Sequence, residues 1–168
     1  MQVILDESAA VVRARRGVLI CRTHHGFVCA NAGVDASNAP EDGALVTLPR
    51  DPDASARALR AALPNRPAVV IADSFGRAWR HGQCDVAIGI AGLTTLDDWR
   101  GRRDPRGLEL RATAIAVADE AAAAADLVRD KASREPAVVV RGLARHVRDD
   151  DGPGAAALLR PPAEDLFL

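Results

Sequence analysis

Residues able to do chemistry are concentrated in one short stretch, residues 71–83. They are an acid, a hydroxyl, two arginines and a histidine, namely Asp73, Ser74, Arg77, Arg80 and His81. A carboxylate beside a hydroxyl offers hard oxygen ligands for a divalent cation, and guanidinium groups bind phosphate or carboxylate oxygens in pairs. The apolar run over residues 68–72 predicts a buried strand that ends at Ala72, and strand ends commonly present functional groups. The stretch therefore predicts a metal and phosphoryl site, with a capped turn and a solvated loop as the structural alternatives.

A second candidate group lies in the small, polar segment of residues 31–38. Asp35 could bind a cation, and Asn38 could contact a base, a sugar or a phosphate. An Asx turn is the alternative, because Asp and Asn side chains readily bond to nearby backbone groups. If the strands before Asp35 and Asp73 pair, the two acids converge, and carboxylates that hold a cation are typical of phosphoryl transfer. The sequence has no P-loop motif, so a nucleotide would bind without one.

The elements that must position these residues mix strands and helices without a regular βαβ order. We expect helices over 2–15, 52–63 and 119–131, a helical turn over 96–99, and strands over 18–21, 27–30, 44–48, 67–72, 86–90, 108–117 and 137–140. Asp51 and Pro52 form a helix start, as cap and first residue. The pattern predicts an α+β fold with mixed or antiparallel sheets and flanking helices.

Composition limits the classes of function. The chain has 168 residues, of which 48% are apolar, and 22 basic residues balance 23 acidic ones, so nothing favours a nucleic-acid partner. Three cysteines without CxxC spacing indicate a reducing, cytoplasmic protein, and neither a signal peptide nor a membrane span is visible. We expect one domain over residues 1–143. The acidic, glycine-containing segment 149–154 predicts a mobile C-terminal tail over residues 144–168.

Several blocks of this sequence together resemble the coenzyme F420:L-glutamate ligase (F420-0 γ-glutamyl ligase) family. They are residues 26–38 (GFVCANAGVDASN), 73–80 (DSFGRAWR), 85–92 (DVAIGIAG), 97–107 (DDWRGRRDPRG), 118–120 (ADE) and 136–143 (PAVVVRGL). The blocks occur in the family's order between about residues 2 and 143. The resemblance implies the fold of these ligases and a homodimer.

The resemblance also implies an activity and a set of site residues. Such an enzyme uses GTP to convert the carboxylate of F420-0 into an acyl phosphate, which the amino group of L-glutamate then attacks. By resemblance, Mg²⁺ or Mn²⁺ is bound by Asp35, Asp73 and Ser74, with K⁺ as a further candidate ion, and the nucleotide contacts Asn38. A catalytic role for Arg77, Arg80 and His81, which would orient phosphate or the acidic substrates, follows from their chemistry alone.

The sequence also departs from the family pattern. The resemblance implies a strand-rich N-terminal region with nucleotide contacts, which we expect to be missing here, and the segment 129–135 replaces a glycine-rich, acidic one. Lys131 in that segment could contact phosphate. Two alternatives therefore accompany the ligase hypothesis: a non-catalytic remnant that binds metal or a partner, and a related amide ligase that uses another acid.

Overall fold

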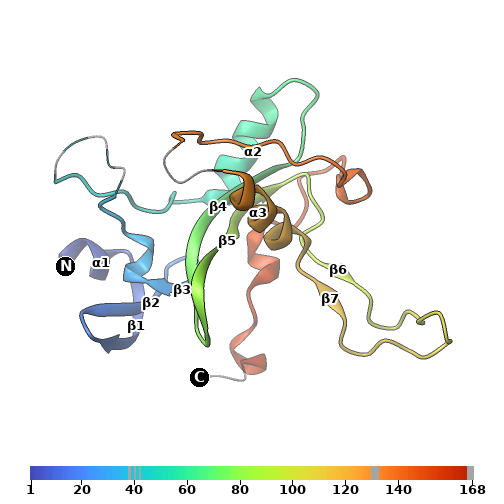
Figure 1. The fold of residues 1–168 in the computed structure, drawn as a ribbon, viewed down its shortest axis with the longest axis horizontal. Coiled ribbons are helices and arrows are strands. Elements are labelled where there is room, and N and C mark those ends of the chain that lie inside the picture. Colours follow the sequence, from blue (N-terminus) through green and yellow to red (C-terminus); the bar gives the residue numbers. More distant parts are fainter. Residues whose placement is uncertain (38, 40, 42, 130–132, 166–168) are drawn as a thin grey trace.

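The computed structural model of the chain describes residues 1–37, 39, 41, 43–129 and 133–165. Its elements are three α-helices, seven strands and four short 3₁₀ turns in this part of the chain (Figure 1). In chain order they are α1 (Gln2–Asp6), β1 (Ser8–Arg15), β2 (Val18–Thr23), β3 (Val28–Ala30), α2 (Pro52–Ala62), β4 (Val69–Arg77), β5 (Arg80–Ala91), β6 (Asp97–Asp98), β7 (Ala114–Ile115) and α3 (Val117–Val128). The mixture of helices with small antiparallel sheets confirms the α+β prediction.

The N-terminal part is a three-stranded antiparallel sheet in the order β1-β2-β3. The strands predicted over 18–21 and 27–30 are confirmed and form a hairpin, in which β2 pairs with β3 and Cys21 lies opposite Cys29. The helix predicted over residues 2–15 is wrong beyond Asp6, since Ser8–Arg15 pairs with β2 as a strand. Apolar residues at helical spacing did not decide the structure there, because a neighbouring strand offered backbone partners.

The centre of the molecule is the long, curved hairpin of β4 and β5 (Figure 1). The prediction that the first of these strands ends at Ala72 is wrong, because β4 runs on to Arg77. The polar stretch is therefore part of a strand, and the hairpin turns between Arg77 and Arg80. The buried apolar cluster lies where β5 meets the helices and the C-terminal segment; its members are Phe27, Leu48, Ala87, Ile88, Ile90, Leu93, Ala118, Ala121 and Ala155.

Helix α2 begins as the sequence predicts and packs closely on β5. The Asp51 carboxylate accepts a hydrogen bond from the Ala54 N–H at 2.8 Å, which caps the helix, and Pro52 occupies its first position. Gly89 in β5 makes the close approach possible, because a Cβ atom there would overlap the Pro52 carbonyl. Asp53 then ties the helix to the strand by accepting from the Ile90 N–H at 2.8 Å.

Beyond β5 the chain forms an arm that carries the charged loop of residues 99–113. Its base is the two-residue pair of β6 and β7, and it extends away from the hairpin (Figure 1). The helical turn predicted over 96–99 is wrong, and the strand predicted over 108–117 is reduced to Ala114–Ile115. The strand predicted over 137–140 is also wrong, and that predicted over 44–48 is reduced to one bridge, between Val46 and Asp35.

The C-terminal segment packs against the domain. The Arg60 guanidinium, buried in α2, donates to the Asp151 carboxylate at 2.6 Å and to the Arg148 and Asp149 carbonyls. The Asp53 carboxylate accepts from the Ala155 N–H at 3.0 Å, and Ala155 is part of the core. The acidic segment predicted to be mobile is therefore held by α2 and β5, while the domain boundary at residue 143 remains a prediction.

None of the helices in the described part of the chain combines the length and the apolar character that crossing a membrane requires.

Candidate functional site

The middle of β4 presents its side chains alternately to two different neighbours. In the regular register of the hairpin, Asp73 pairs with Val86, Ser74 with Asp85 and Phe75 with Cys84. Successive side chains of a strand point to opposite faces. Phe75 meets Phe27 edge to face at 6.2 Å, so Asp73 and Phe75 share the face toward β3. Ser74 points to the other face, which α3 covers.

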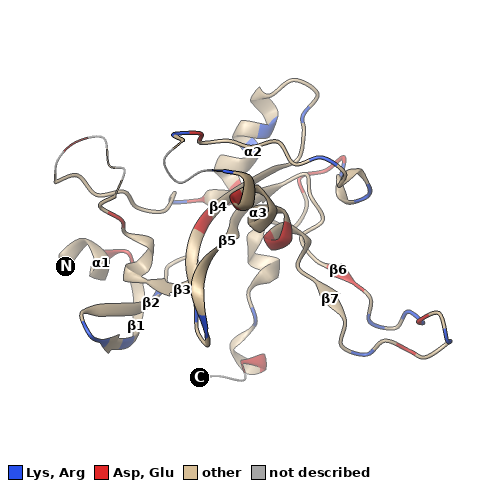
Figure 2. Cartoon of the chain, viewed as in Figure 1, with Lys and Arg blue, Asp and Glu red and all other residues tan. Residues whose placement is uncertain are grey.

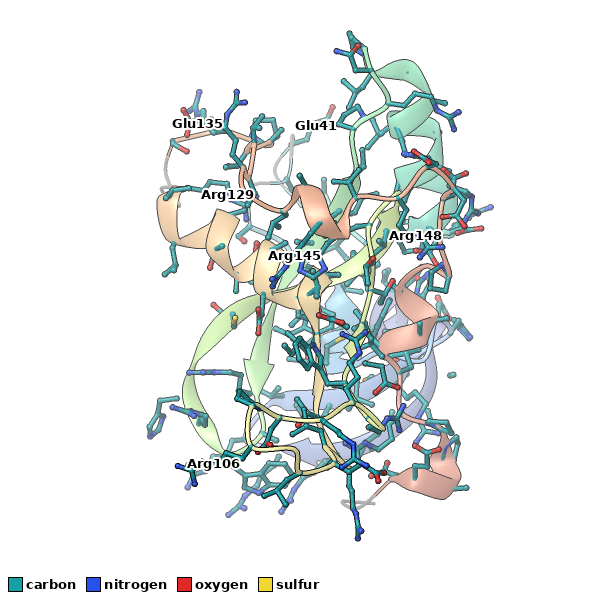
Figure 3. All side chains as sticks on the ribbon, turned by 90° about the vertical axis from the view of Figure 1, so that its right-hand side faces the viewer. Glu41, Arg106, Arg129, Glu135, Arg145 and Arg148 are labelled. Atoms are coloured by element: carbon teal, nitrogen blue, oxygen red, sulfur yellow. The ribbon has the colours of Figure 1, made fainter. Side chains whose placement is uncertain are left out.

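On the α3 face, three polar side chains form a connected group. The Ser74 hydroxyl donates to one oxygen of the Asp85 carboxylate at 2.6 Å. The other oxygen of Asp85 accepts from the Arg129 guanidinium, also at 2.6 Å. Asp85 is only 1% exposed, whereas the Arg129 side chain is 29% exposed at the end of α3. Figure 3 shows Arg129 at the end of α3 that lies beside the segment carrying Glu135. A buried carboxylate therefore links the hydroxyl of β4 to a cation from the helix.

On the β3 face, Asp73 lies near Cys29. Burial raises the pKa of the Cys29 thiol to about 11, and electrostatic interactions with Asp73 and Cys21 add to the rise. Strands β3 and β4 are in contact, and Asp73 is on the face of β4 that is directed toward β3. Cys29 is therefore a neutral thiol at physiological pH, and Asp73 is the charged group on this side of the strand.

The chain runs from Cys29 to Asp35 through a tight left-handed turn. Asn31, Ala32 and Gly33 all have positive φ angles, of 51°, 55° and 73°. Non-glycine residues rarely adopt this conformation, so two in succession store backbone strain next to the candidate site. The Asn31 side chain supports the turn by accepting from the Leu19 N–H at 3.3 Å.

Asp35 lies just beyond this turn, at the molecular surface. Its backbone pairs with Val46, and its carboxylate accepts from the Ser37 N–H at 2.8 Å and from the Ser37 hydroxyl. This is the Asx-type arrangement named above as the alternative. The local bonds orient the carboxylate.

The predicted catalytic residues lie at the tip of the β4–β5 hairpin. Arg77, Arg80 and His81 are exposed, and the Arg77 guanidinium donates to the His81 and Gly82 carbonyls of the same turn. Trp79, which lies in the same turn, is 75% exposed. Because β4 rises about 3.3 Å per residue, Arg77 lies roughly 10 Å along the strand from Ser74. The structure gathers these three residues together but separates them from Asp73 and Ser74.

Two further predictions fall on residues outside the described part of the chain. These are the nucleotide contact of Asn38 and the phosphate contact of Lys131. Within the described part, no three acids, histidines or cysteines are grouped as a metal site. The predicted set of Asp35, Asp73 and Ser74 has two carboxylates and a hydroxyl. These hard oxygen donors suit Mg²⁺ or Mn²⁺, and such ions often keep water and phosphate oxygens as their remaining ligands.

A cavity of about 410 Å³ lies elsewhere, between β6, β7, the first half of α3 and the segment 140–146. Charged groups of both signs line it, among them Glu120, Arg141 and Arg145. The Arg145 guanidinium donates to the Nε2 atom of the buried His146 at 2.8 Å. None of the predicted site residues that the structure describes lines this cavity.

Sequence reasoning gave no role to Asp85 and Arg129. Asp85 does carry a signal, because it is an acid at the start of the apolar run 85–91, where a buried strand has no need of charge. Its position opposite Ser74 does not follow from the turn at residues 78–79 alone, because a register shift between Gly76 and Arg77 moves the pairing by two residues. Arg129 offers no comparable signal, since a cation at the end of a helix is accounted for by the helix dipole.

Comparison with known proteins identifies the class to which this fold and site belong. The chain matches the F420-0:Gamma-glutamyl ligase family over residues 1–142 and belongs to that family, as the sequence motifs predict. Among individual proteins, it is 46% identical to the coenzyme F420:L-glutamate ligase of Methanothermobacter thermautotrophicus, over 99% of this chain and 68% of that protein. The enzymes of the same name from Methanopyrus kandleri and Methanocaldococcus jannaschii are 44% and 41% identical, with 68% and 67% of their lengths covered.

Proposed function

We propose that this protein ligates L-glutamate to F420-0 in coenzyme F420 biosynthesis, with GTP as the second substrate. In this reaction the F420-0 carboxylate attacks the terminal phosphorus of GTP, which forms an acyl phosphate and releases GDP. The glutamate amine then attacks the acyl carbon, an amide bond forms, and inorganic phosphate leaves. The observation that carries the proposal is the family match over residues 1–142, which includes the Asp73–Ser74 pair in the middle of the central hairpin.

The proposed metal ligands are Asp35, Asp73 and Ser74. A bound Mg²⁺ or Mn²⁺ would neutralise charge on the phosphate oxygens during transfer, and K⁺ is a further candidate ion. Asp73 lies on the β3 face of β4 and Ser74 on the α3 face, so the two side chains would bind separate ions rather than a single one. Asn38 is the proposed nucleotide contact.

Arg77, Arg80 and His81 are proposed to orient phosphate or the carboxylates of the acidic substrates. Their support is chemical: they are exposed and lie in one turn, and guanidinium groups bind planar oxyanions in pairs. Figure 2 shows basic residues at this tip and acidic residues farther up the hairpin. A substrate that reaches both regions would have to extend along the strand, as a nucleotide triphosphate or a glutamate-bearing acid could.

Two alternatives from different classes remain to be tested beside the ligase. A non-catalytic protein that binds metal or a partner would keep the fold, and a related amide ligase would use another acid. The chain spans about two thirds of the length of the curated relatives that it matches. A cytoplasmic homodimer is part of the ligase proposal.

The test is a ligation assay with the purified 168-residue chain, F420-0, L-glutamate, GTP and Mn²⁺. We expect a glutamyl product detected by mass spectrometry, GDP in equal amount, and no product after chelation of the metal or replacement of GTP by a non-hydrolysable analogue. Calorimetric binding of GTP and Mn²⁺ without turnover would favour the non-catalytic alternative. Turnover with another acid in place of F420-0 would favour the related ligase.

A further inference from the structure

The cavity between β6, β7, α3 and the segment 140–146 brings together parts of the sequence that have no role in the proposed metal site. Three of the blocks that carry the family resemblance contribute to its lining, and they are residues 97–107, 118–120 and 136–143. These blocks are far apart in the chain and meet only in the folded molecule. The cavity has a volume of about 410 Å³, which lies in the range of about 300–1,000 Å³ that is usual for ligand sites.

The cavity combines a buried apolar wall with charged groups. Helix α3 contributes residues at the spacing i, i+3, i+4 and i+7, which share one face of a helix; they are Val117, Glu120, Ala121 and Ala124. Val117 and Ala121 are buried, whereas Glu120 is exposed. Val140 and Leu143 add apolar surface from the opposite segment. Such a lining suits a small ligand that has an aliphatic chain between charged ends.

The two carboxylates of the lining differ in whether they are already paired. The Asp97 carboxylate accepts from the Trp99 indole N–H at 2.9 Å and lies 3.4 Å from the Arg102 guanidinium. In the part of the chain that the structure describes, the side chains of Glu120 and Arg141 form no hydrogen bond and no ion pair, with each other or with other residues. The cavity therefore presents one anion and one cation that can both pair with a ligand.

A second cation, Arg145, is held in place by a neighbouring ring. Its Nε–H group donates to the Nε2 atom of His146 at 2.8 Å, and His146 is only 6% exposed. A ring nitrogen that accepts carries no proton, so His146 is neutral and does not repel the guanidinium. The bond uses the Nε–H group and leaves the terminal N–H groups of Arg145, which bind carboxylates well. Figure 3 shows Arg145 beside α3, which also lines the cavity.

We propose that this cavity binds an acidic amino acid, with Glu120 at its ammonium group and with Arg141 and Arg145 at its two carboxylates. One unpaired anion and two cations match the single positive and two negative charges of such a ligand, and the apolar wall takes its methylene groups. The choice of L-glutamate as that amino acid rests on the function proposed above. The tip of the β4–β5 hairpin is then left to GTP or F420-0.

The experiment is an NMR titration of the isotope-labelled chain with L-glutamate, without GTP or metal, because the proposed contacts require neither. We expect saturable shifts of backbone signals in the first half of α3 and in the segment 140–146. L-Glutamine lacks the side-chain carboxylate and glutarate lacks the ammonium group. Each should bind about 10-fold more weakly than L-glutamate, since each loses one charge-assisted hydrogen bond.

Variants of the chain assign each charge of the ligand to its partner. Arg141→Gln should weaken the binding of both L-glutamate and glutarate by about 10-fold. Glu120→Gln should weaken L-glutamate by the same factor but should not weaken glutarate, which has no ammonium group. Arg106→Gln and Glu109→Gln, on the β6–β7 arm and outside the lining, are the matched controls and should bind L-glutamate like the wild type.

The outcomes separate this inference from the proposed ligase function. Product formation in the ligation assay without saturable shifts at the cavity would overturn the inference and leave the function standing. Binding with the expected selectivity but without product would support the inference and count against the function. Equal affinity for L-glutamate, L-glutamine and glutarate, or an equal loss of L-glutamate and glutarate in Glu120→Gln, would overturn the inference. Circular dichroism checks the fold of the variants, and the three ligands test the wild type if a variant does not fold.

Discussion

The middle and the tip of the β4–β5 hairpin contain similar residue types but differ in structure. In the middle, Ser74 and Asp85 lie opposite each other and Arg129 reaches them from α3, so each polar group has a fixed partner. At the tip, Arg77 bonds only to carbonyls of its own turn, and Arg80 and His81 are exposed. Fixed groups suit the binding of an ion with strict geometry, whereas exposed cations suit the attraction of a flexible anion.

The largest loss of activity should come from a substitution on the β3 face of the hairpin, in its middle part. Asp73→Asn preserves shape but removes the charge that a cation requires, so metal-dependent ligation should fall about 100-fold or more, since substitutions beside a metal already cost up to that amount. Product formation by mass spectrometry at saturating Mn²⁺ measures the loss. The control is Asp98→Asn in β6, an exposed acid that pairs with Arg100, which should keep its activity. Undiminished turnover by Asp73→Asn would remove this residue from the site.

The next contrast concerns stability. Asp85→Ala leaves the Arg129 guanidinium without its buried partner, and breaking such a pair costs about 3–5 kcal/mol in the free energy of unfolding. Because Arg129 is partly exposed, we expect the lower end of this range. At the tip, Arg77→Ala should cost only about 0.5 kcal/mol, as is usual for exposed side chains. Urea unfolding of both variants measures the difference, and equal losses would contradict the contrast between middle and tip.

A smaller effect is expected at the tip of the hairpin, where a substitution should change KM but not kcat. If Arg80 orients an anionic substrate, Arg80→Ala should raise the KM for GTP or for F420-0 by about 10-fold, the loss of one charge-assisted hydrogen bond, and leave kcat nearly unchanged. The matched control is Arg106→Ala at the end of the β6–β7 arm (Figure 3). A KM shift no greater than that of the control would exclude the tip from substrate binding.

The smallest expected change is a pKa shift on the β3 face. Without the Asp73 charge, the pKa of Cys29 should fall below its value of about 11, although burial still keeps it above the ordinary 9.0. In the wild type the unfolded thiol loses its proton first, so the contribution of Cys29 to stability falls as pH rises from about 9 to 11. Asp73→Asn should make this fall smaller. Carbon NMR of labelled cysteine measures the pKa, and an unchanged value would place Asp73 away from Cys29.

The sequence predicted the family, the fold class and the helix start at Asp51, because these depend on local chemistry or on motifs. It was wrong where pairing between distant segments decided the structure. Residues 8–15 have helical spacing but are a strand, since β2 lies beside them. β4 continues beyond its apolar run because backbone hydrogen bonds with β5 do not require apolar side chains.

The site was predictable only in part for the same reason. Asp73 and Ser74 are adjacent in sequence, which suggested a single cluster, but the strand turns them to opposite faces. The link from Ser74 to Arg129 joins residues far apart in the sequence through Asp85, so no local pattern could show it. Arg77, Arg80 and His81 were grouped correctly with one another, since a tight turn keeps them together.

The C-terminal segment has a consequence for how this protein can be shortened. The family match stops at residue 142, and a chain cut at that residue would lack Asp151 and the carbonyls of Arg148 and Asp149. The buried Arg60 guanidinium would then lose these acceptors. It lies so close to Gly92 that a Cβ atom at that position would overlap it. A truncated chain should therefore expose this part of α2 to proteases, and the smallest stable unit should extend at least to Ala155, where Asp53 anchors the segment.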